Sequence, residues 1–372
     1  MTSKERIQLT FKNQQPDRAP IFEQSICSRA ASEILGRKAH VGGGDLRRAE
    51  SDAWLNGEDS HAEFVATMID DVSELVNKLR FNMVRIPWRN TARPTKKLDK
   101  DTYLYGDFDG NFSVCQYIES SDIFEGIDST IKRRGLPAME EAVQSMENDL
   151  EQGWKLDPQV LIDFDTLNAK AGTDLGHASP AGGISIPFDS EWLEATIEAP
   201  DLVHRYLNCQ CEMGIIAMQQ YAEHGADCFW AGGDLADNRG VVYGPKAFRN
   251  FMLPPLKRLA EQANKLKIPY LFRTDGDTYS IADDLFLESG IHGYGEIDVD
   301  AGMNLYLLKK RFPKLTLWGG MSCGKLLVDG TEAEIRAEAE KLLRELSPNG
   351  GYIFGSSNSI NCGVSVEKYL IM

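Results

Sequence analysis

Short apolar segments alternate with longer amphipathic ones through the second half of the chain, and this alternation strongly limits the folds it can adopt. Candidate strands lie at residues 227–232, 269–272, 291–295, 315–318 and 352–354. The segments between them have the length and apolar spacing of helices. Strands and helices that alternate in this way imply right-handed crossovers and a parallel sheet.

We predict that this sheet closes into one (β/α)₈ barrel formed by residues 1–372. The chain is longer than a usual single domain, but a barrel with insertions accommodates its 372 residues, and no linker divides it. A dinucleotide-binding fold lacks support, because no GxGxxG motif follows a predicted strand and opens a helix.

The N-terminal segment is predicted to be a helix that packs across the barrel. Thr2 and Glu5 have the spacing of a capping box, and Ile7 and Phe11 lie on one helical face. Prolines end this helix and lead into a short strand expected at residues 20–23.

The next part of the chain contains further helices and one expected insertion. An apolar stripe at residues 64–79 predicts a helix, and it leads into a buried strand at 82–86. Residues 89–135 are rich in loop-forming residues, and an Asp-Gly turn at 109–110 beside aromatic residues predicts a hairpin insertion. Another helix is predicted at 137–150.

Composition argues against several kinds of partner. The 40 basic and 56 acidic residues give a net charge of −16, and such a field repels nucleic acid. No apolar run approaches the ~20 residues that cross a bilayer, and the N-terminus lacks the apolar stretch of a secretory signal. The seven cysteines are irregularly spaced, as expected for reduced thiols. We therefore expect a cytoplasmic protein with no membrane or nucleic-acid partner.

Polar residues follow the apolar strands repeatedly. They are Glu23, Arg85, Trp88, Asp234, Asp237, Arg273, Asp275, Glu296, Asp298, Ser356, Ser357 and Asn358. In parallel barrels the reacting groups lie at the carboxyl ends of the strands, and buried charges are costly unless they are paired or used. Asp234, Asp275 and Glu296 each follow a different strand beside a glycine, so we predict that these three are catalytic.

For other residues at the strand ends, structural roles compete with a role in the site. Asp237 precedes Asn-Arg-Gly and either shapes a loop or joins the site. Glu23 is interpreted as a structural partner of Arg85 or Arg273. Asp298 is expected to lie in a loop or to cap the following helix.

Several segments of the chain resemble the uroporphyrinogen decarboxylase superfamily. They are Lys4-Glu5-Arg6, residues 16–20, Gly225-Ala226-Asp227, Asp234-Leu235-Ala236, residues 243–248, Leu253-Pro254, Asp275-Gly276-Asp277, Glu288-Ser289-Gly290, Gly302-Met303, residues 318–321 and residues 364–368. The resemblance covers most of the chain and is weak between about residues 24 and 200. It implies a barrel enzyme, and its motifs are specific for the superfamily without being specific for one activity.

The chain departs from two known activities of this superfamily. Residues 23–30 lack the Arg-rich pattern with which true uroporphyrinogen decarboxylases grip substrate carboxylates, and residues 355–358 lack the late histidine. Thiol-methylating members bind zinc through a His-x-Cys motif and a late cysteine, where this chain has residues 273–275 and 356–357. Porphyrin decarboxylation and a thiolate zinc site are therefore disfavoured. Zinc bound by oxygen or nitrogen ligands, to which His177, His224 or His292 could contribute, stays open.

The resemblance then points to a substrate-side methyltransferase. Such an enzyme would pass a methyl group from a small methylated compound, in first place an aryl methyl ether, to the Co(I) of a cobamide carried by a partner corrinoid protein. Asp275 or Glu296 is the candidate acid, and Arg273 would orient the substrate. The other expected substrate contacts are Arg85, Ser357, Asn358, Phe22, Trp88 and Tyr243. A decarboxylase or lyase acting on a small carboxylic acid or a tetrapyrrole is the alternative, and a homodimer stays open.

Overall fold

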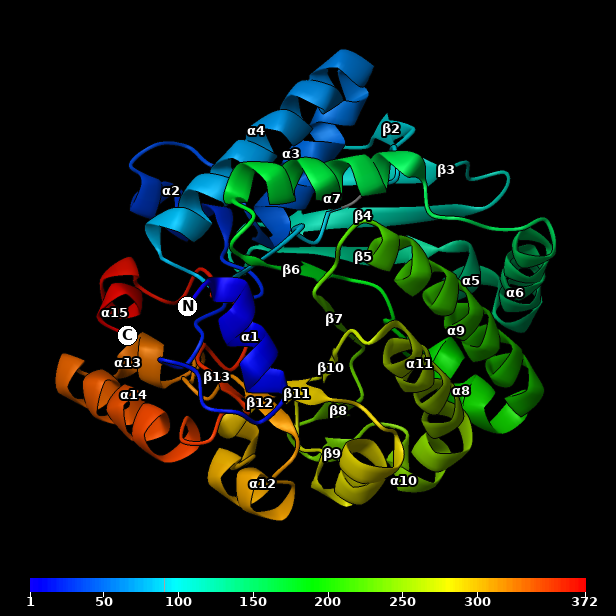
Figure 1. Cartoon of the computed structure of the whole chain (residues 1–372). Coiled ribbons are helices and arrows are strands. Elements are labelled where there is room, and N and C mark those ends of the chain that lie inside the picture. Colours follow the sequence, from blue (N-terminus) through cyan, green and yellow to red (C-terminus); the bar gives the residue numbers. More distant parts are fainter. Residues whose placement is uncertain (90) are drawn as a thin grey trace.

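The computed structural model describes residues 1–89 and 91–372, and its centre is a parallel sheet of seven strands (Figure 1). In spatial order the strands are β1 (Met83–Arg85), β6 (Gly176–Ser179), β7 (Cys228–Gly232), β10 (Tyr270–Arg273), β11 (Gly293–Gly295), β12 (Thr316–Trp318) and β13 (Tyr352–Ile353). All six pairings between neighbours are parallel. The predicted α/β architecture with a parallel sheet is confirmed. The expected closed barrel of eight strands is not, because the sheet of the described residues has seven strands and does not close.

The two edge strands of this sheet are both hydrogen-bonded to the segment in which an eighth strand was expected. Ile21 forms a parallel bridge with Phe354, and the Phe22 N–H donates to the Phe354 carbonyl at 3.0 Å. On the other side, the Asn82 N–H donates to the Ile21 carbonyl at 2.8 Å. The segment makes a single bridge and no regular strand, because Pro20 has no N–H to extend a ladder.

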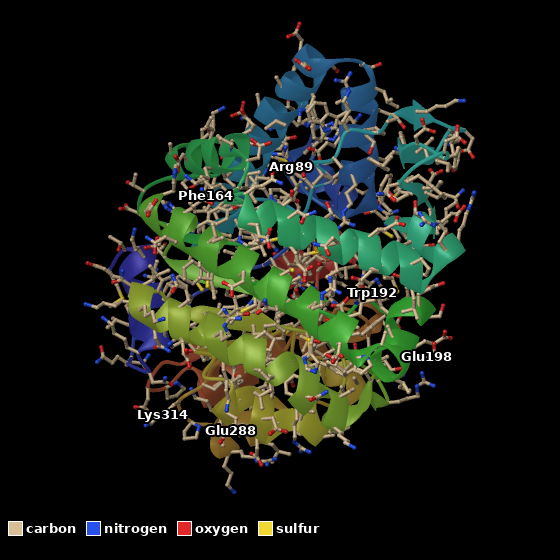
Figure 2. The ribbon with its side chains drawn as sticks, turned by 90° about the vertical axis from the view of Figure 1, so that its right-hand side faces the viewer. Arg89, Phe164, Trp192, Glu198, Glu288 and Lys314 are labelled. Atoms are coloured by element: carbon tan, nitrogen blue, oxygen red, sulfur yellow. The ribbon has the colours of Figure 1, made fainter. Side chains whose placement is uncertain are left out.

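Helices surround the sheet (Figure 1). They are α1 (Ser3–Phe11), α2 (Ser28–Leu35), α3 (Gly43–Leu55), α4 (Glu58–Lys78), α5 (Thr130–Arg134), α6 (Leu136–Glu151), α7 (Pro158–Ala171), α8 (Ser190–Glu198), α9 (Pro200–Glu223), α10 (Gly244–Ala247), α11 (Leu253–Leu266), α12 (Leu305–Arg311), α13 (Leu326–Asp329), α14 (Glu332–Leu346) and α15 (Val366–Ile371). Helices α6, α9 and α11 lie side by side over one side of the molecule (Figure 2). In the part of the chain that the structure describes, no helix is long and apolar enough to span a membrane.

The predicted helices form with two irregularities. The capping box of α1 is present, since the Thr2 side chain accepts from the Glu5 N–H and the Glu5 carboxylate accepts from the Thr2 N–H. The helical segment expected between β7 and β10 contains a π-helical turn, Phe248–Met252, shortly before two prolines that lack N–H donors. The helical segment expected between β10 and β11 consists of a 3₁₀ turn, Tyr279–Ile281, followed by a π turn, Asp284–Glu288.

The predicted hairpin is part of a larger antiparallel sheet. It has four strands in the order β2 (Lys96–Lys97), β3 (Thr102–Gly106), β4 (Phe112–Ile118) and β5 (Ile123–Ser129). The β3–β4 hairpin turns at the expected Asp-Gly pair, and a further two-stranded ribbon joins β8 (Ala236–Asp237) to β9 (Gly240–Val241). Tyr103, Tyr105, Tyr117 and Phe124 form a small aromatic core of their own in the insertion.

A second, compact apolar cluster fills the interior of the central sheet. Its members are Ile7, Phe22, Met83, Ala178, Cys228, Trp230, Leu271, Trp318 and Ile353. They come from both edges of the sheet, and Phe22 and Trp230 meet edge to face with ring centroids 4.7 Å apart. Strand β11 contributes glycine here, because a Cβ on Gly295 would lie 2.4 Å from the indole of Trp318. The curved sheet therefore encloses a packed core, as small parallel barrels do.

Candidate functional site at the carboxyl ends of the strands

A buried ion pair joins the ends of β10 and β11. Arg273 Nη1 donates to Glu296 Oε2 at 2.8 Å, and the Gln24 side-chain amide donates to the other Glu296 oxygen. Glu296 is buried and has a backbone φ of 59°, a left-handed conformation that is uncommon for a residue with a side chain. Burial raises the pKa of Glu296, and the charge of Arg273 opposes that shift. The fold therefore holds this carboxylate in a fixed place beside one guanidinium.

A second arginine approaches the same group through Trp88. The guanidinium carbons of Arg85 and Arg273 lie 4.2 and 4.3 Å from the centroid of the Trp88 ring. Arg85 is 5% exposed, and burial, with Arg273 as the next cause, lowers its pKa to about 9. The group stays charged at neutral pH, so two cations and one carboxylate meet around this indole.

Asp275 lies two residues beyond the end of β10 and is held by Asn358. The Asn358 amide Nδ2 donates to Asp275 Oδ1 at 2.8 Å. Burial first, and then the charges of Glu296, Asp234 and Asp298, raise the pKa of Asp275 to about 8. A carboxyl group with this pKa is mostly protonated at pH 7 and is able to donate a proton.

Glu23 is also a buried acid, but its partner differs from the prediction. Its carboxylate accepts from the Ser356 N–H at 3.0 Å and from the Ser356 hydroxyl, and no hydrogen bond to Arg85 or Arg273 is made within the described chain. Burial raises the pKa of Glu23 to about 8. The expected pairing with an arginine is wrong, because residue 356 lies on the neighbouring segment and meets Glu23 first.

The remaining acids at the strand ends are more exposed. Asp234 is exposed beyond β7. Asp237 pairs with exposed Arg239 at 2.8 Å and accepts from its N–H, so it shapes the loop, which is one of its two expected roles. Asp298 accepts from the N–H groups of Asp300 and Ala301 and caps the short 3₁₀ helix at Val299–Ala301, as predicted.

Three residues expected to contact the substrate, Phe22, Tyr243 and Ser357, pack against other parts of the protein. Phe22 is fully buried inside the central sheet against Trp230 and does not line the cleft described next. Tyr243 packs against other apolar residues and does not line that cleft either. Ser357 is buried, and its hydroxyl accepts from the Cys323 N–H at 3.3 Å.

A cleft near these residues has a volume of about 480 Å³ and opens beside the ends of β1 and β6. Arg85 and Trp88 line it, whereas Asp234, Asp275, Glu296 and Asn358 do not. The cleft and the acids are linked through Trp88, whose ring contacts both Arg85 and Arg273.

The lining of the cleft is mostly apolar and includes one paired cation, Arg89. The apolar lining includes Trp154, Leu156, Val160, Met213, Ala217 and Tyr221. Arg89, labelled in the upper part of Figure 2, donates to Glu50 at 2.9 Å and to Asp163 at 2.6 Å. Sequence reasoning missed these residues and Gln24, because the weakly patterned region that contains most of them gave no strand signal at residues 176–179.

Potential metal ligands are dispersed over the described residues. Among residues 1–89 and 91–372, no three His, Cys, Asp or Glu side chains are grouped so that they could hold a metal ion. Burial raises the pKa of the Cys323 thiol to about 11, and its sulfur lies 3.6 Å from the Ser357 hydroxyl. His292 accepts from the Tyr270 N–H at the opposite end of β10. The strand ends do not fit a thiolate zinc site, so none of the steps proposed below uses one.

Comparisons with known proteins agree with this architecture. The chain superposes over its full length on 97% of a methyltransferase from Methanosarcina mazei, with a TM-score of 0.66 and 16% sequence identity. At this identity the likeness shows a shared fold. A search of curated proteins found no match. The family model for uroporphyrinogen decarboxylase (URO-D) matches residues 187–372, which is half of the chain and contains β7 to β13 with their acids. The chain belongs to the uroporphyrinogen decarboxylase family.

Proposed function

We propose that the chain is a single-domain cytoplasmic methyltransferase. It takes a methyl group from a small methylated compound, in first place an aryl methyl ether, and passes it to the Co(I) of a corrinoid on a partner protein. The observation that carries the proposal is Asp275, an acid with a raised pKa that Asn358 holds beside a paired arginine and carboxylate. The likeness in fold to the methyltransferase from M. mazei supports it.

Methyl transfer from an ether needs an acid at the leaving oxygen. As the bond between oxygen and the methyl carbon breaks, the oxygen takes the proton of Asp275 and leaves as a neutral phenol. The methyl acceptor supplies the electron pair of the new bond, so Co(I) becomes Co(III). The hydrogen bond from Asn358 then stabilises the Asp275 carboxylate until it regains a proton from solvent.

The remaining groups at the strand ends suit binding and access. The apolar cleft that Trp88 and Trp154 line would hold an aromatic ring and exclude water. Asp234 is exposed and Asp275 is partly exposed, so the strand ends open to solvent, where an acceptor carried by another protein could approach. Glu296 keeps Arg273 in place through a buried ion pair.

Spectroscopy with purified components tests the proposal. The enzyme is mixed with a candidate methyl ether and a corrinoid protein reduced to Co(I), and the cobalt spectrum is followed over time. We expect the Co(I) absorption to be replaced by that of the methylated corrinoid, and we expect the Asp275→Asn variant to be slower by ~10²-fold or more. No cobalt methylation from any of a panel of methyl ethers and methylamines would contradict the proposal.

A carboxy-lyase is the second candidate, and Arg85 is the observation in its favour. A buried guanidinium suits a substrate carboxylate, and the acid Asp275 could protonate the carbon that loses carbon dioxide. Release of carbon dioxide from a small carboxylic acid, without cobalt methylation, would favour this candidate over methyl transfer.

A further inference from the structure

Arg85 is a buried cation with unused donors. It is 5% exposed, and its Nε and Nη1 atoms have no hydrogen-bond partner within residues 1–89 and 91–372. Leaving a charged donor buried without an acceptor is costly, and native proteins satisfy most such groups. The side chain lines the 480 Å³ cleft, so a ligand in that cleft could supply the acceptor.

The charges around Arg85 leave one positive charge without a partner. Glu296 is the carboxylate whose charge raises the pKa of Arg85, but its two oxygens already accept hydrogen bonds from Arg273 and Gln24. Arg273 contributes a second cation to the same group. Arg89, which also lines the cleft, is paired with two carboxylates. Arg85 is therefore a cation of the cleft that keeps buried donors without a partner in the described residues.

We propose that Arg85 binds a carboxylate of the substrate, so that the methyl donor is an aromatic monocarboxylate that carries a methyl ether. This inference rests on the proposed function and names its substrate class. A guanidinium presents parallel N–H donors at the spacing of two carboxylate oxygens. The aromatic ring would pack against the apolar wall formed by Trp154, Leu156 and Met213.

The surroundings of Arg85 favour one carboxylate over a phosphate or several carboxylates. A phosphate carries up to two charges and three acceptor oxygens and usually collects several donors, whereas this end of the cleft offers one guanidinium with free donors. The rest of the wall is mainly apolar and would leave additional charges unpaired. The net charge of −16 would also repel a polyanion more strongly than a monoanion.

Calorimetric binding on the protein alone tests this inference without a corrinoid. The ligands are 3-methoxybenzoate and 4-methoxybenzoate, with methoxybenzene as the neutral analogue and inorganic phosphate as a competing anion. The variants are Arg85→Met and, as a matched control on the surface of α14, Arg336→Met. We expect one of the benzoates to bind the unaltered protein and Arg336→Met equally, and Arg85→Met ~10- to 100-fold more weakly. Methoxybenzene should bind weakly to all three.

Thermal melting separates binding from a structural role of Arg85. Replacing a buried, unpaired charge by a side chain of similar length and apolar character often leaves stability unchanged or raises it. We therefore expect Arg85→Met to melt at or above the temperature of the unaltered protein. A lower melting temperature together with unchanged benzoate binding would show that Arg85 is structural and would overturn the inference.

Three other results would also overturn it. The first is equal affinity for methoxybenzene and the benzoates. The second is displacement of the benzoates by phosphate at a concentration lower than that of the benzoate, and the third is no benzoate binding. Its failure can be told apart from that of the proposed function. Arg85-dependent binding without cobalt methylation contradicts the proposed function alone. Methyl transfer from neutral ethers that Arg85→Met leaves unchanged contradicts the inference alone.

Discussion

The interior of the central sheet and the loops that follow its strands have opposite chemistry. Inside the sheet, the space is filled by apolar side chains such as Trp230 and Trp318, both nearly inaccessible to solvent. At the carboxyl ends, a few residues further along the same strands, Arg273, Asp275 and Glu296 lie in a largely buried polar group. The apolar interior buries and packs its side chains closely, while the polar group at the carboxyl ends contains charge without a full set of partners and acids with raised pKa values.

This difference separates the residues that stabilise the central sheet from those that would act on a substrate. In the apolar interior the side chains fit one another closely, as Gly295 opposite the indole of Trp318 shows. The polar end contains buried donors and acceptors without partners in the described residues, namely Arg273 Nε and Gln24 Oε1. Groups that reduce stability without an evident structural return are the ones expected to have a function. Substitutions in the apolar interior should therefore reduce stability, and substitutions in the polar group should reduce activity.

The largest effect on stability is expected from substitutions in the apolar interior of the sheet. Trp230→Ala removes a buried indole that contacts Phe22 and Trp318 and should lower the free energy of unfolding by ~3–5 kcal/mol. Trp88→Ala, at the edge of the cleft, should lower it by less. Denaturant unfolding measures both free energies. Equal losses for the two variants would contradict the distinction between the apolar interior and the polar group.

At the polar end, Asp275→Asn should affect catalysis and leave the fold intact. The proton donor is lost, so the rate of methyl transfer should fall ~10²-fold or more. Because the folded protein keeps Asp275 protonated at neutral pH, the amide should not reduce stability. Initial rates and a denaturant titration check the two parts, and a fully active variant would remove Asp275 from the mechanism.

A smaller effect should follow from crowding the apolar interior of the sheet. In Gly295→Ala the new methyl group would meet the indole of Trp318, and overpacking of this kind costs ~1–3 kcal/mol. Gly126→Ala in the insertion is the matched control, because a methyl group added there would have no atom within 4 Å. Unfolding free energies within ~0.5 kcal/mol of each other for the two variants would contradict the packing argument.

A further effect concerns the pH dependence of stability. The pKa of Glu23 is about 8 in the folded protein, against an ordinary value of 4.5. A raised carboxyl pKa means that the folded state holds a proton that the unfolded state has lost, so stability falls as pH rises from about 4.5 to about 8. Glu23→Gln should remove this contribution and melt a few degrees above the unaltered protein at pH 8, with little difference near pH 4. Parallel melting curves across this range would show that Glu23 titrates normally.

The regular half of the fold could be predicted from sequence, because its strands are apolar runs between amphipathic helices. The strand at residues 176–179 reads Gly-His-Ala-Ser and has no such signal, so β6 and the cleft beside it were missed. The acids at the strand ends were found by position alone. Which of them are joined depended on side-chain direction: Glu23 turned to Ser356, and Phe22 turned into the core. Sequence spacing does not determine these directions.

The most direct test of the account is the protonation state of Asp275. Infrared difference spectroscopy of the unaltered protein against Asp275→Asn, recorded across a pH series, isolates the carbonyl band of one protonated carboxyl group. The account predicts that this band is present at pH 7 and disappears with a midpoint near pH 8. A band that is already absent at pH 6 would show that Asp275 is an ordinary carboxylate, and it would contradict the proposal that this residue supplies the proton.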